Sequence, residues 1–294
     1  MPSADRPLGE AFDDVAEDYD RAREGYSTEI VARAVELGRL GRDSRVLEVG
    51  CGTGKLTELL VQLGLRVDAV DPGARMIAMA ERRVGSTDRV VFHVGRFEDL
   101  PLPNAGFDAL FSATAFHWLD ARVSWTKAAS HLRPRGLLAL LTHTSVRDER
   151  STESERAFRE LLRKYAPAVT EGWPPPRDLK TLLAGADARS RNASEVWDWV
   201  MGDGRHELAS DDAARWFEAV DVTAVVSDVE RTADELLAHF RTTSLYFQIE
   251  PDKRGAFEEE DRRRIEAGGG SVHFSAAIVL MTARRSRAPV TGLR

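Results

Sequence analysis

Short apolar runs alternate with helix-patterned stretches between residues 46 and 141 of this chain. Five of these runs have the length and apolar character of buried strands. They are residues 46–49, 67–70, 90–94, 107–111 and 137–141. Because the intervening stretches are helical, the alternation predicts repeated βα units around a parallel sheet.

Two of the connecting helices have recognisable ends. Leucines recur at helical spacing after the first strand, and Gly64 follows them as a C-cap. A later helix is predicted from Asp120 as N-cap to about residue 132, where Pro134 and Gly136 end it. The βα alternation is therefore unbroken as far as the fifth strand.

The alternation stops after Thr142. Residues 147–213 are charged, contain three consecutive prolines and include a helical stretch at 155–165. The pattern returns with an apolar run at 217–225, a helix at 233–241 and a strand at 275–282. We interpret this as one domain with an insertion. Its predicted parts are an N-terminal helical segment at 1–40, a core at 41–146 and 214–294, and an inserted cap or lid at 147–213.

The first strand leads into a glycine-rich turn with glycines at every second position, Gly50, Gly52 and Gly54. Glycines here permit positive φ and let a ligand approach the backbone. A dinucleotide site requires the spacing G-x-G-x-x-G, which this turn lacks. Glu48 precedes the turn, and its carboxylate would repel a pyrophosphate but attract an amino group.

Asp71 closes the second strand, where an acidic side chain can accept hydrogen bonds from both hydroxyls of a ribose. Strand, turn, helix, strand and Asp71 together predict a nucleoside-type ligand. The alternative is a tight βα turn followed by a surface aspartate.

Residues 48–54 with Asp71 resemble the cofactor motif of class I S-adenosylmethionine-dependent methyltransferases. Residues 12–26, 107–112 and 115–120 resemble the small-molecule branch of that family, which includes trans-aconitate methyltransferase-like enzymes. The resemblance implies an α/β fold with a doubly wound, mostly parallel, seven-stranded Rossmann-like sheet. It also implies S-adenosylmethionine as cofactor and an N-terminal segment that folds over it.

The resemblance also implies which residues bind the cofactor. The glycine turn would hold the methionine portion, Asp71 the ribose, and Met76 the adenine. The residue after Gly95 is usually acidic in this branch, but here it is Arg96, so the adenine contact falls to the Phe97 backbone or to Glu98. The full set is Tyr19, Glu48, Gly50, Cys51, Gly52, Asp71, Pro72, Met76, Phe97, Glu98, Ser112 and Ala113.

His117 is the candidate base or substrate contact, since it follows the fourth strand at the edge of the sheet where such folds bind ligands. The alternative is that it packs the turn. Tyr19 is predicted to place its ring beside the sulfonium through cation–π attraction. Four tryptophans of the later chain either line an apolar substrate pocket or form the core of the cap: Trp173, Trp197, Trp199 and Trp216.

Composition limits the remaining possibilities. The formal net charge is −7 and the arginines are scattered, which argues against nucleic acid as a partner. One cysteine and the histidine spacing predict no metal site. No apolar stretch approaches the roughly 18 residues of a membrane helix, and the first residues do not resemble a secretory signal. We therefore expect a cytoplasmic protein that acts on a small molecule.

Two alternatives to a methyltransferase stay open. One is a protein that binds S-adenosylmethionine for a structural role or a cyclisation, since fold and cofactor site do not determine the reaction. The other is a nucleotide-dependent oxidoreductase, which the glycine spacing and Glu48 disfavour. The acceptor, the atom methylated and the oligomeric state are not predicted.

Overall fold

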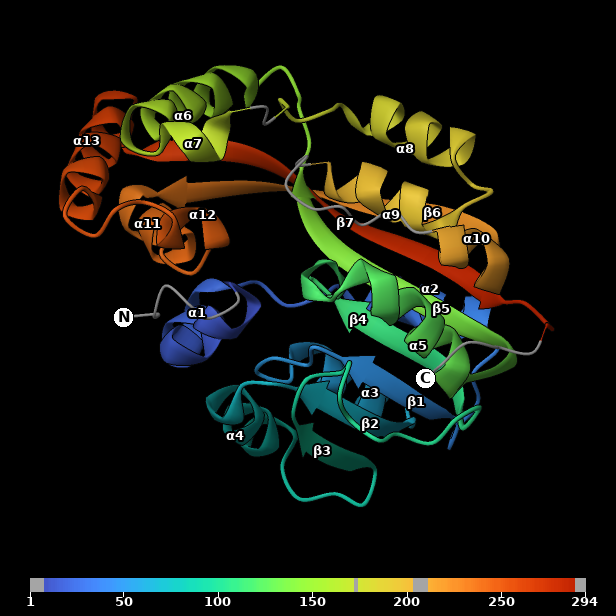
Figure 1. Cartoon of the computed structure of the whole chain (residues 1–294). Coiled ribbons are helices and arrows are strands. Elements are labelled where there is room, and N and C mark those ends of the chain that lie inside the picture. The colour runs from blue at the N-terminus through green and yellow to red at the C-terminus, as the bar shows by residue number, and fades with distance from the viewer. Residues whose placement is uncertain (1–7, 172–173, 203–210, 289–294) are drawn as a thin grey trace.

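The computed structural model describes residues 8–171, 174–202 and 211–288. Its centre is a seven-stranded sheet of order β3-β2-β1-β4-β5-β7-β6 (Figure 1). The strands are β1 Arg45–Val49, β2 Arg66–Asp71, β3 Val90–Val94, β4 Phe107–Ala113, β5 Leu132–Ser145, β6 Phe217–Thr232 and β7 Ser271–Arg285. The first five pair in parallel, and β7 is antiparallel to both β5 and β6. The predicted fold class is confirmed.

Helices cover both faces of the sheet. They are α1 Ala16–Ala22, α2 Thr28–Gly38, α3 Lys55–Gln62, α4 Ala74–Val84, α5 Ala121–His131, α6 Thr152–Tyr165, α7 Pro167–Thr170, α8 Leu179–Ala188, α9 Ala193–Met201, α10 Asp211–Trp216, α11 Ala233–Phe240, α12 Ser244–Phe247 and α13 Arg254–Ala267. Short 3₁₀ helices span Leu8–Val15 (η1) and Phe116–Trp118 (η2). Leu47 and Val49 of β1 pack with α5, α8, α9 and α10, whereas Val46 packs with α2 and α3. This alternation is the two-residue period of a strand covered on both sides.

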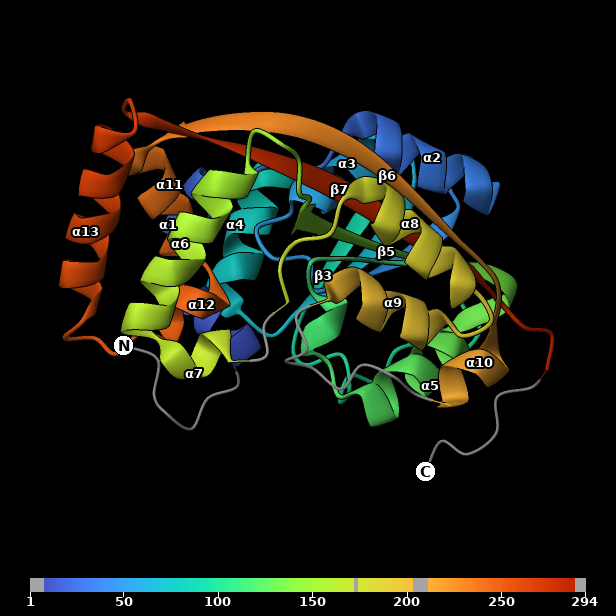
Figure 2. The same ribbon diagram turned by 90° about the horizontal axis from the view of Figure 1, so that it is seen from above.

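The last three strands are longer than the apolar runs that predicted them. β6 pairs with β7 from Phe217 opposite Arg285 to Thr232 opposite Ser271, while the pairing of β5 with β7 ends at Ser145 opposite Ala276. The ends of β6 and β7 therefore extend beyond the sheet as a two-stranded ribbon. Figures 1 and 2 show this ribbon reaching α11 and α13.

The segment expected to form the cap, residues 147–213, is divided between two places. Its first helices, α6 and α7, gather with α11, α12 and α13 at the end of the ribbon (Figure 2). Phe158 and Leu162 of α6 share a hydrophobic cluster with Phe240 and Phe257. The later helices, α8 and α9, instead pack on the core through residues such as Leu182 and Trp197. Two segments distant in sequence thus build the helical cap, because neither buries its apolar face alone.

Helix α5 begins and ends close to where the sequence predicts. Asp120 caps α5 as predicted, and its side chain accepts a hydrogen bond from the Arg122 backbone N–H at 3.0 Å. The helix ends at His131, within one residue of the predicted end, and Leu132 then pairs with Phe107 of β4.

Candidate functional site

The glycine turn between β1 and α3 has the backbone shape that its sequence requires. Gly50 and Gly52 have φ of 73° and 53°, in the left-handed region that favours glycine. The backbone N–H groups of Gly50 and Cys51 both donate to the Val70 carbonyl oxygen, at 2.8 and 3.0 Å. These bonds hold the turn against the end of β2, so the turn and Asp71 lie side by side.

Asp71 connects the turn to the loop after β2. Its carboxylate accepts hydrogen bonds from the N–H groups of Gly52, at 2.9 Å, and Gly73, at 2.8 Å. Burial raises the pKa of Asp71 to about 6, against the lowering effect of these two bonds. The carboxylate is therefore mostly ionised at neutral pH and sits at the edge of a cavity.

We call this space the glycine-turn cavity, and its volume is about 330 Å³. Seven of the predicted site residues line it: Tyr19, Gly50, Gly52, Asp71, Met76, Ala113 and His117. Gly73, Phe12, Asp13 and Trp118 also line it. A Cβ added at Gly52 would meet no atom within 4 Å, so the backbone there faces open space. The cavity is thus shaped for a ligand that approaches the turn closely.

Six predicted cofactor residues do not line this cavity: Glu48, Cys51, Pro72, Phe97, Glu98 and Ser112. Phe97 is buried in the core against His131. The Glu98 carboxylate accepts the Asp120 backbone N–H at 3.1 Å, at the start of α5. Ser112 Oγ donates to the Val49 carbonyl oxygen at 2.7 Å, across β4 and β1. These contacts hold the side chains of Phe97, Glu98 and Ser112 within the protein. Direct contact between the six residues and the cofactor stays a prediction.

Glu48 lies on β1 beneath the turn and is 1% exposed. Burial, together with the neighbouring charge of Asp71, raises its pKa to about 8. Its Oε2 has no hydrogen-bond partner among the described residues. Glu48 is therefore mostly protonated at neutral pH, and a cationic ligand in the cavity above would favour its ionisation.

Glu48→Gln is expected to remove a pH dependence of stability. A pKa of about 8 lies above the ordinary 4.5, so the folded state holds the proton more tightly than the unfolded state. The free energy of unfolding of the wild type therefore falls as pH rises from 4.5 to about 8. Over that range the free energy of unfolding of the glutamine variant should fall by up to about 4 kcal/mol less. Urea unfolding across this pH range measures the difference, with Glu58→Gln on the same turn–helix unit as control. Parallel pH profiles for wild type and Glu48→Gln would contradict the expectation.

The N-terminal segment is fastened over the cavity by polar contacts. Asp20 accepts hydrogen bonds from Thr53 Oγ1 at 2.7 Å and from Arg83 at 2.6 Å. Lys55 Nζ donates to the Asp20 carbonyl oxygen at 2.8 Å. Asp13 accepts from the backbone N–H of Arg75, at the start of α4, at 2.8 Å. The segment is thereby held against the turn and α4.

Aromatic side chains of this segment complete the wall. The Phe12 ring lies between those of Tyr19 and Trp118, with centroids at 5.7 and 5.8 Å. The Arg23 guanidinium lies 5.4 Å from the Tyr19 ring centroid. Tyr19 thus already has a cation nearby, and its predicted contact with a sulfonium stays a prediction.

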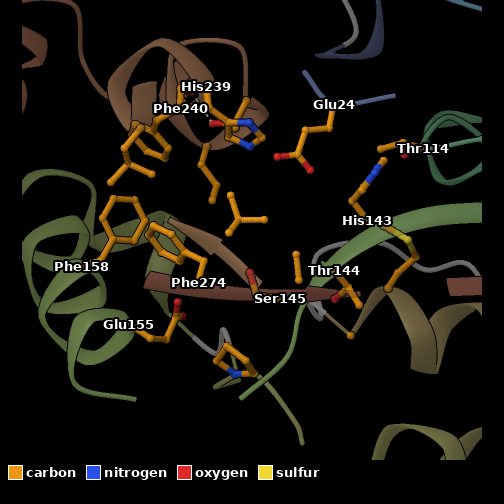
Figure 3. A pocket seen from close by; sticks show the side chains of 18 of the residues that line it. Glu24, Thr114, His143, Thr144, Ser145, Glu155, Phe158, His239, Phe240 and Phe274 are labelled. Atoms are coloured by element: carbon orange, nitrogen blue, oxygen red, sulfur yellow. Dashed lines mark hydrogen bonds between the residues drawn. The ribbon is translucent and has the colours of Figure 1, made fainter. Parts of the chain in front are cut away.

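A second cavity, of about 370 Å³, adjoins the first. We call it the aromatic cavity, because Phe158, Phe240 and Phe274 line one end, while Thr114 and His143 line the other (Figure 3). Residues that line both cavities are Tyr19, Arg23, Thr114, His143, Ser145, Met201, Thr243 and Leu245. The two spaces therefore meet at the carboxyl ends of β4 and β5.

Three tryptophans of the later chain, Trp197, Trp199 and Trp216, do not line this cavity. Trp197 and Trp216 are 0% and 1% exposed and belong to the core. Trp199 packs against the guanidinium of Arg177, with 3.8 Å from Cζ to the ring centroid. Trp173 lies outside the described residues. For Trp197 and Trp216 the core interpretation is the correct one, and phenylalanines of α6, α11 and β7 line the cavity.

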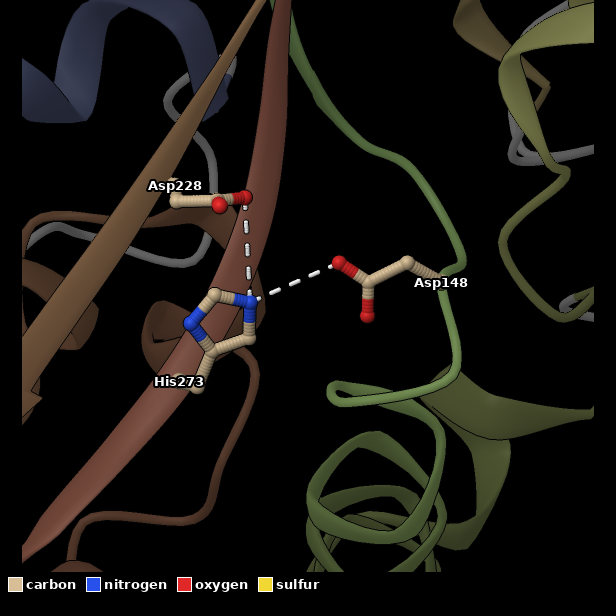
Figure 4. A group of neighbouring side chains, drawn as sticks. All are labelled: Asp148, Asp228 and His273. Carbon is tan, nitrogen blue, oxygen red and sulfur yellow. Dashed lines mark hydrogen bonds and ion pairs between the residues drawn. The ribbon is translucent and has the colours of Figure 1, made fainter.

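Outside both cavities, Asp148, Asp228 and His273 come together on the ribbon (Figure 4). His273 Nε2 lies 3.4 Å from Asp148 and 3.8 Å from Asp228. Ser275 Oγ donates to Asp228 at 2.9 Å and also to Asp148, which holds the pKa of Asp148 well below its ordinary value. These bonds tie the segment before α6 to β6 and β7. These bonds account for the close approach of the three side chains. That the chain binds no metal stays a prediction.

Within the described part of the chain, no helix has the length and apolar character needed to cross a membrane.

Comparison with known proteins finds a matching family and several relatives. Residues 47–140 match the family described as a methyltransferase domain. An uncharacterised methyltransferase of Mycobacterium tuberculosis is 36% identical over 150 residues, which cover 51% of this chain and 58% of that protein. The chain therefore spans less than two thirds of this relative. An uncharacterised methyltransferase of Geobacillus is 32% identical over 166 residues, which cover 51% of this chain and 76% of that protein.

A further relative carries an activity in its name. The ubiquinone biosynthesis O-methyltransferase of Methylocella silvestris is 30% identical over 179 residues, covering 56% of this chain and 69% of that protein. Among solved structures, a proposed type II methyltransferase of Anaeromyxobacter dehalogenans has a TM-score of 0.57 at 20% identity, covering 91% of this chain and 99% of that one. This structural similarity supports the assignment of the fold class.

Proposed function

The chain belongs to the class I S-adenosylmethionine-dependent methyltransferases, and on that premise we propose that it methylates an oxygen atom of a small organic acceptor. The choice of oxygen is supported by the Methylocella relative, which is an O-methyltransferase. Methylation at carbon or nitrogen is the alternative for this site.

The observation that carries the proposal is the junction of the two cavities. One has the glycine turn and a buried carboxylate, Asp71, and the other has an apolar end lined by Phe158, Phe240 and Phe274. They meet at Thr114 and His143, where two parallel strands end, which is where open α/β sheets bind ligands. Donor and acceptor bound in these spaces would face each other at the junction.

The residues of the glycine-turn cavity fit the cofactor. Gly52 faces open space, where its backbone would hold the methionine portion. The Asp71 carboxylate would accept the ribose hydroxyls, and Met76, which is 4% exposed, would pack on the adenine. The bound cofactor supplies a methyl group on a sulfonium, which is already activated for displacement.

The protein contributes alignment to the transfer. In-line displacement requires the attacking atom and the methyl carbon to lie roughly 3 to 3.5 Å apart, and holding them there can supply much of the acceleration. The segment fastened by Asp20 excludes water from one side. The aromatic cavity binds the body of the acceptor through apolar contacts with Phe158, Phe240 and Phe274.

We also propose a cytoplasmic location and a partner other than nucleic acid. The single cysteine, which is buried, supports the location, and the net charge of −7 supports the choice of partner.

Two measurements test the proposed function. S-adenosylmethionine and S-adenosylhomocysteine should raise the melting temperature, whereas NAD should not. Release of S-adenosylhomocysteine with small hydroxylated or carboxylic acceptors should then be detected. Tight cofactor binding without product from any acceptor would favour the alternative of a protein that uses the cofactor for a structural role or a cyclisation.

A further inference from the structure

The described wall of the aromatic cavity carries more positive than negative charge. Six charged side chains line it: Arg23, Glu24, Glu155, Arg159, Arg177 and Arg231. Four of them are arginines and two are glutamates, in a chain whose formal net charge is −7. The positive surplus is therefore a local property of this cavity, and it favours an anionic ligand.

Both glutamates of this wall already have an arginine partner. Arg231 pairs with Glu24 at 2.7 Å. Arg159 pairs with Glu155 at 4.0 Å, and both side chains of this second pair are largely buried. The two pairs neutralise four of the six charges, so the surplus consists of the other two arginines.

Of those two arginines, only Arg23 reaches the junction of the cavities. Arg177 lines the aromatic cavity alone, where it packs on the Trp199 ring and donates to the Trp199 carbonyl oxygen at 2.9 Å. Arg23 lines both the aromatic cavity and the glycine-turn cavity. No carboxylate of the described residues forms an ion pair with Arg23, and the charged groups that act on it are Tyr19, Tyr26 and Arg231.

The Arg23 guanidinium is fixed in place but not saturated with acceptors. Its Nε donates to Thr242 Oγ1 at 3.0 Å, and Nη2 donates to the Thr242 carbonyl oxygen at 2.8 Å. Nη1 lies 3.5 Å from His239 Nε2. A guanidinium has five N–H groups, so at least two have no acceptor among the described residues.

The contact with His239 also shows on which side of the junction the cation lies. His239 lines the aromatic cavity and not the glycine-turn cavity, and Figure 3 shows it beside Phe240. Nη1 of Arg23 is therefore next to the wall of the aromatic cavity, where the acceptor would bind.

The charge of Arg23 is incompletely compensated where it lies. Burial lowers the pKa of Arg23, and the charge of Arg231 acts in the same direction, although a guanidinium stays protonated. Burial, with these two arginines, also lowers the pKa of His239, to about 3, so that this ring is neutral. A desolvated cation without a partner costs free energy, which an anionic ligand would offset.

The junction also favours an acceptor that needs no base. The nearest imidazole on β5, that of His143, has its Nε2 buried, so this atom is not presented to a ligand. A carboxyl group has a pKa of about 4 and is already ionised at neutral pH, whereas a hydroxyl group has to lose a proton. A carboxylate therefore matches both the charge and the chemistry of the junction.

We propose that Arg23 holds the carboxylate of an apolar organic acid at the junction, and that this carboxylate is the methyl acceptor. The inference rests on the proposed function and specifies its acceptor. A carboxylate oxygen attacks the methyl carbon with a lone pair and forms an oxygen–carbon bond. The bond between that carbon and sulfur breaks, and its electron pair stays on sulfur. The products are a neutral methyl ester and a neutral thioether, and no proton is transferred.

Charge then distinguishes the substrate from the product. The body of the acid packs against Phe158, Phe240 and Phe274 both before and after transfer. The carboxylate pairs with Arg23 only before transfer, because the ester has no charge. The ester should therefore bind more weakly than the acid, which favours its release.

The competing assignment is that Arg23 pairs with the carboxylate of the cofactor's methionine portion, since it also lines the glycine-turn cavity. The position of Nη1 beside His239 favours the acceptor. The affinity of Arg23→Gln for S-adenosylhomocysteine decides between them. We expect this affinity to stay within about twofold of the wild-type value, and a fall of tenfold or more would overturn the proposal.

The first test is binding to the full chain saturated with S-adenosylhomocysteine. Isothermal titration compares three apolar acids, 1-naphthoate, 4-phenylbutyrate and octanoate, with their methyl esters. We expect at least one acid to bind about tenfold or more tightly than its ester, and Arg23→Gln to lose this preference. Arg21→Gln, an exposed neighbour on α1 that pairs with Asp18, should behave as wild type.

A second variant separates recognition from a purely structural role of Arg23. Thr242→Val removes the hydroxyl acceptor of the guanidinium but keeps its charge and the carbonyl acceptor. It should therefore retain the preference for the acid. If Thr242→Val lost the preference as completely as Arg23→Gln, Arg23 would only tie the N-terminal segment to the end of α11, and the proposal would fail.

The last test is turnover of the same three acids and of the primary alcohols with the same carbon skeletons. Release of S-adenosylhomocysteine and the mass of the methyl ester report the reaction. We expect an ester from an acid that binds, and a fall in kcat/KM of roughly 10- to 100-fold in Arg23→Gln, as expected for loss of a charge-assisted hydrogen bond. Methylation of the alcohols in preference, or an ester from none of the acids, would overturn the inference and leave the proposed function intact. Failure of the wild type to bind S-adenosylmethionine would instead refute the proposed function.

Discussion

Asp71→Ala is expected to weaken S-adenosylmethionine binding roughly 100-fold, or about 2.7 kcal/mol. The carboxylate lines the glycine-turn cavity and is mostly ionised at neutral pH. The variant loses the acceptor for the ribose hydroxyls, and it also leaves the N–H groups of Gly52 and Gly73 without their partner. Isothermal titration with S-adenosylhomocysteine measures the change without turnover.

Asp68→Asn is the matched control for Asp71→Ala. Asp68 lies on the same strand but pairs with Arg45 and His93, away from the cavity. It should bind the cofactor as tightly as wild type. In the wild type, affinity should also fall as pH drops below about 6, because protonation of Asp71 removes an acceptor. Equal affinities for Asp71→Ala and Asp68→Asn would contradict the assignment of the ribose site.

Gly50→Ala is expected to destabilise the fold by roughly 3 kcal/mol. An added Cβ would stand 2.2 Å from the Ala115 Cβ, and φ at this position is 73°. Overpacking of this kind costs about 1–3 kcal/mol. The left-handed conformation costs a non-glycine residue about 1–2 kcal/mol more. The free energy of unfolding in urea measures the loss.

Two further variants separate these causes. Gly52→Ala has the φ penalty but no neighbour within 4 Å, so it should cost only about 1 kcal/mol. Ala115→Gly in the Gly50→Ala background removes the collision and should restore stability to near that of Gly52→Ala. Equal losses for Gly50→Ala and Gly52→Ala would show that the contact with Ala115 is not the cause.

Arg135 is a non-glycine residue with a left-handed backbone, and its φ is 70°. It lies inside β5 between Leu132 and Leu137, where the pairing with β4 is irregular, and it lines neither cavity. The left-handed conformation therefore falls at a local irregularity of the strand and away from the site.

The sequence by itself determined the sheet and the glycine turn, because both depend on residues close together along the chain. Gly50 and Gly52 are required by local φ values, and Asp71 reaches the turn because β1 and β2 are neighbours in one βαβ unit. The continuous apolar runs likewise indicated that these strands are buried.

Tertiary structure alone decided what lines the junction of the two cavities. His143 reaches this junction only because β5 pairs with β4 and β7. The wall opposite joins Phe158 to Phe240 across the ribbon. Such contacts depend on which apolar surfaces pack together, and periodicity reports that a surface is buried without specifying its partner.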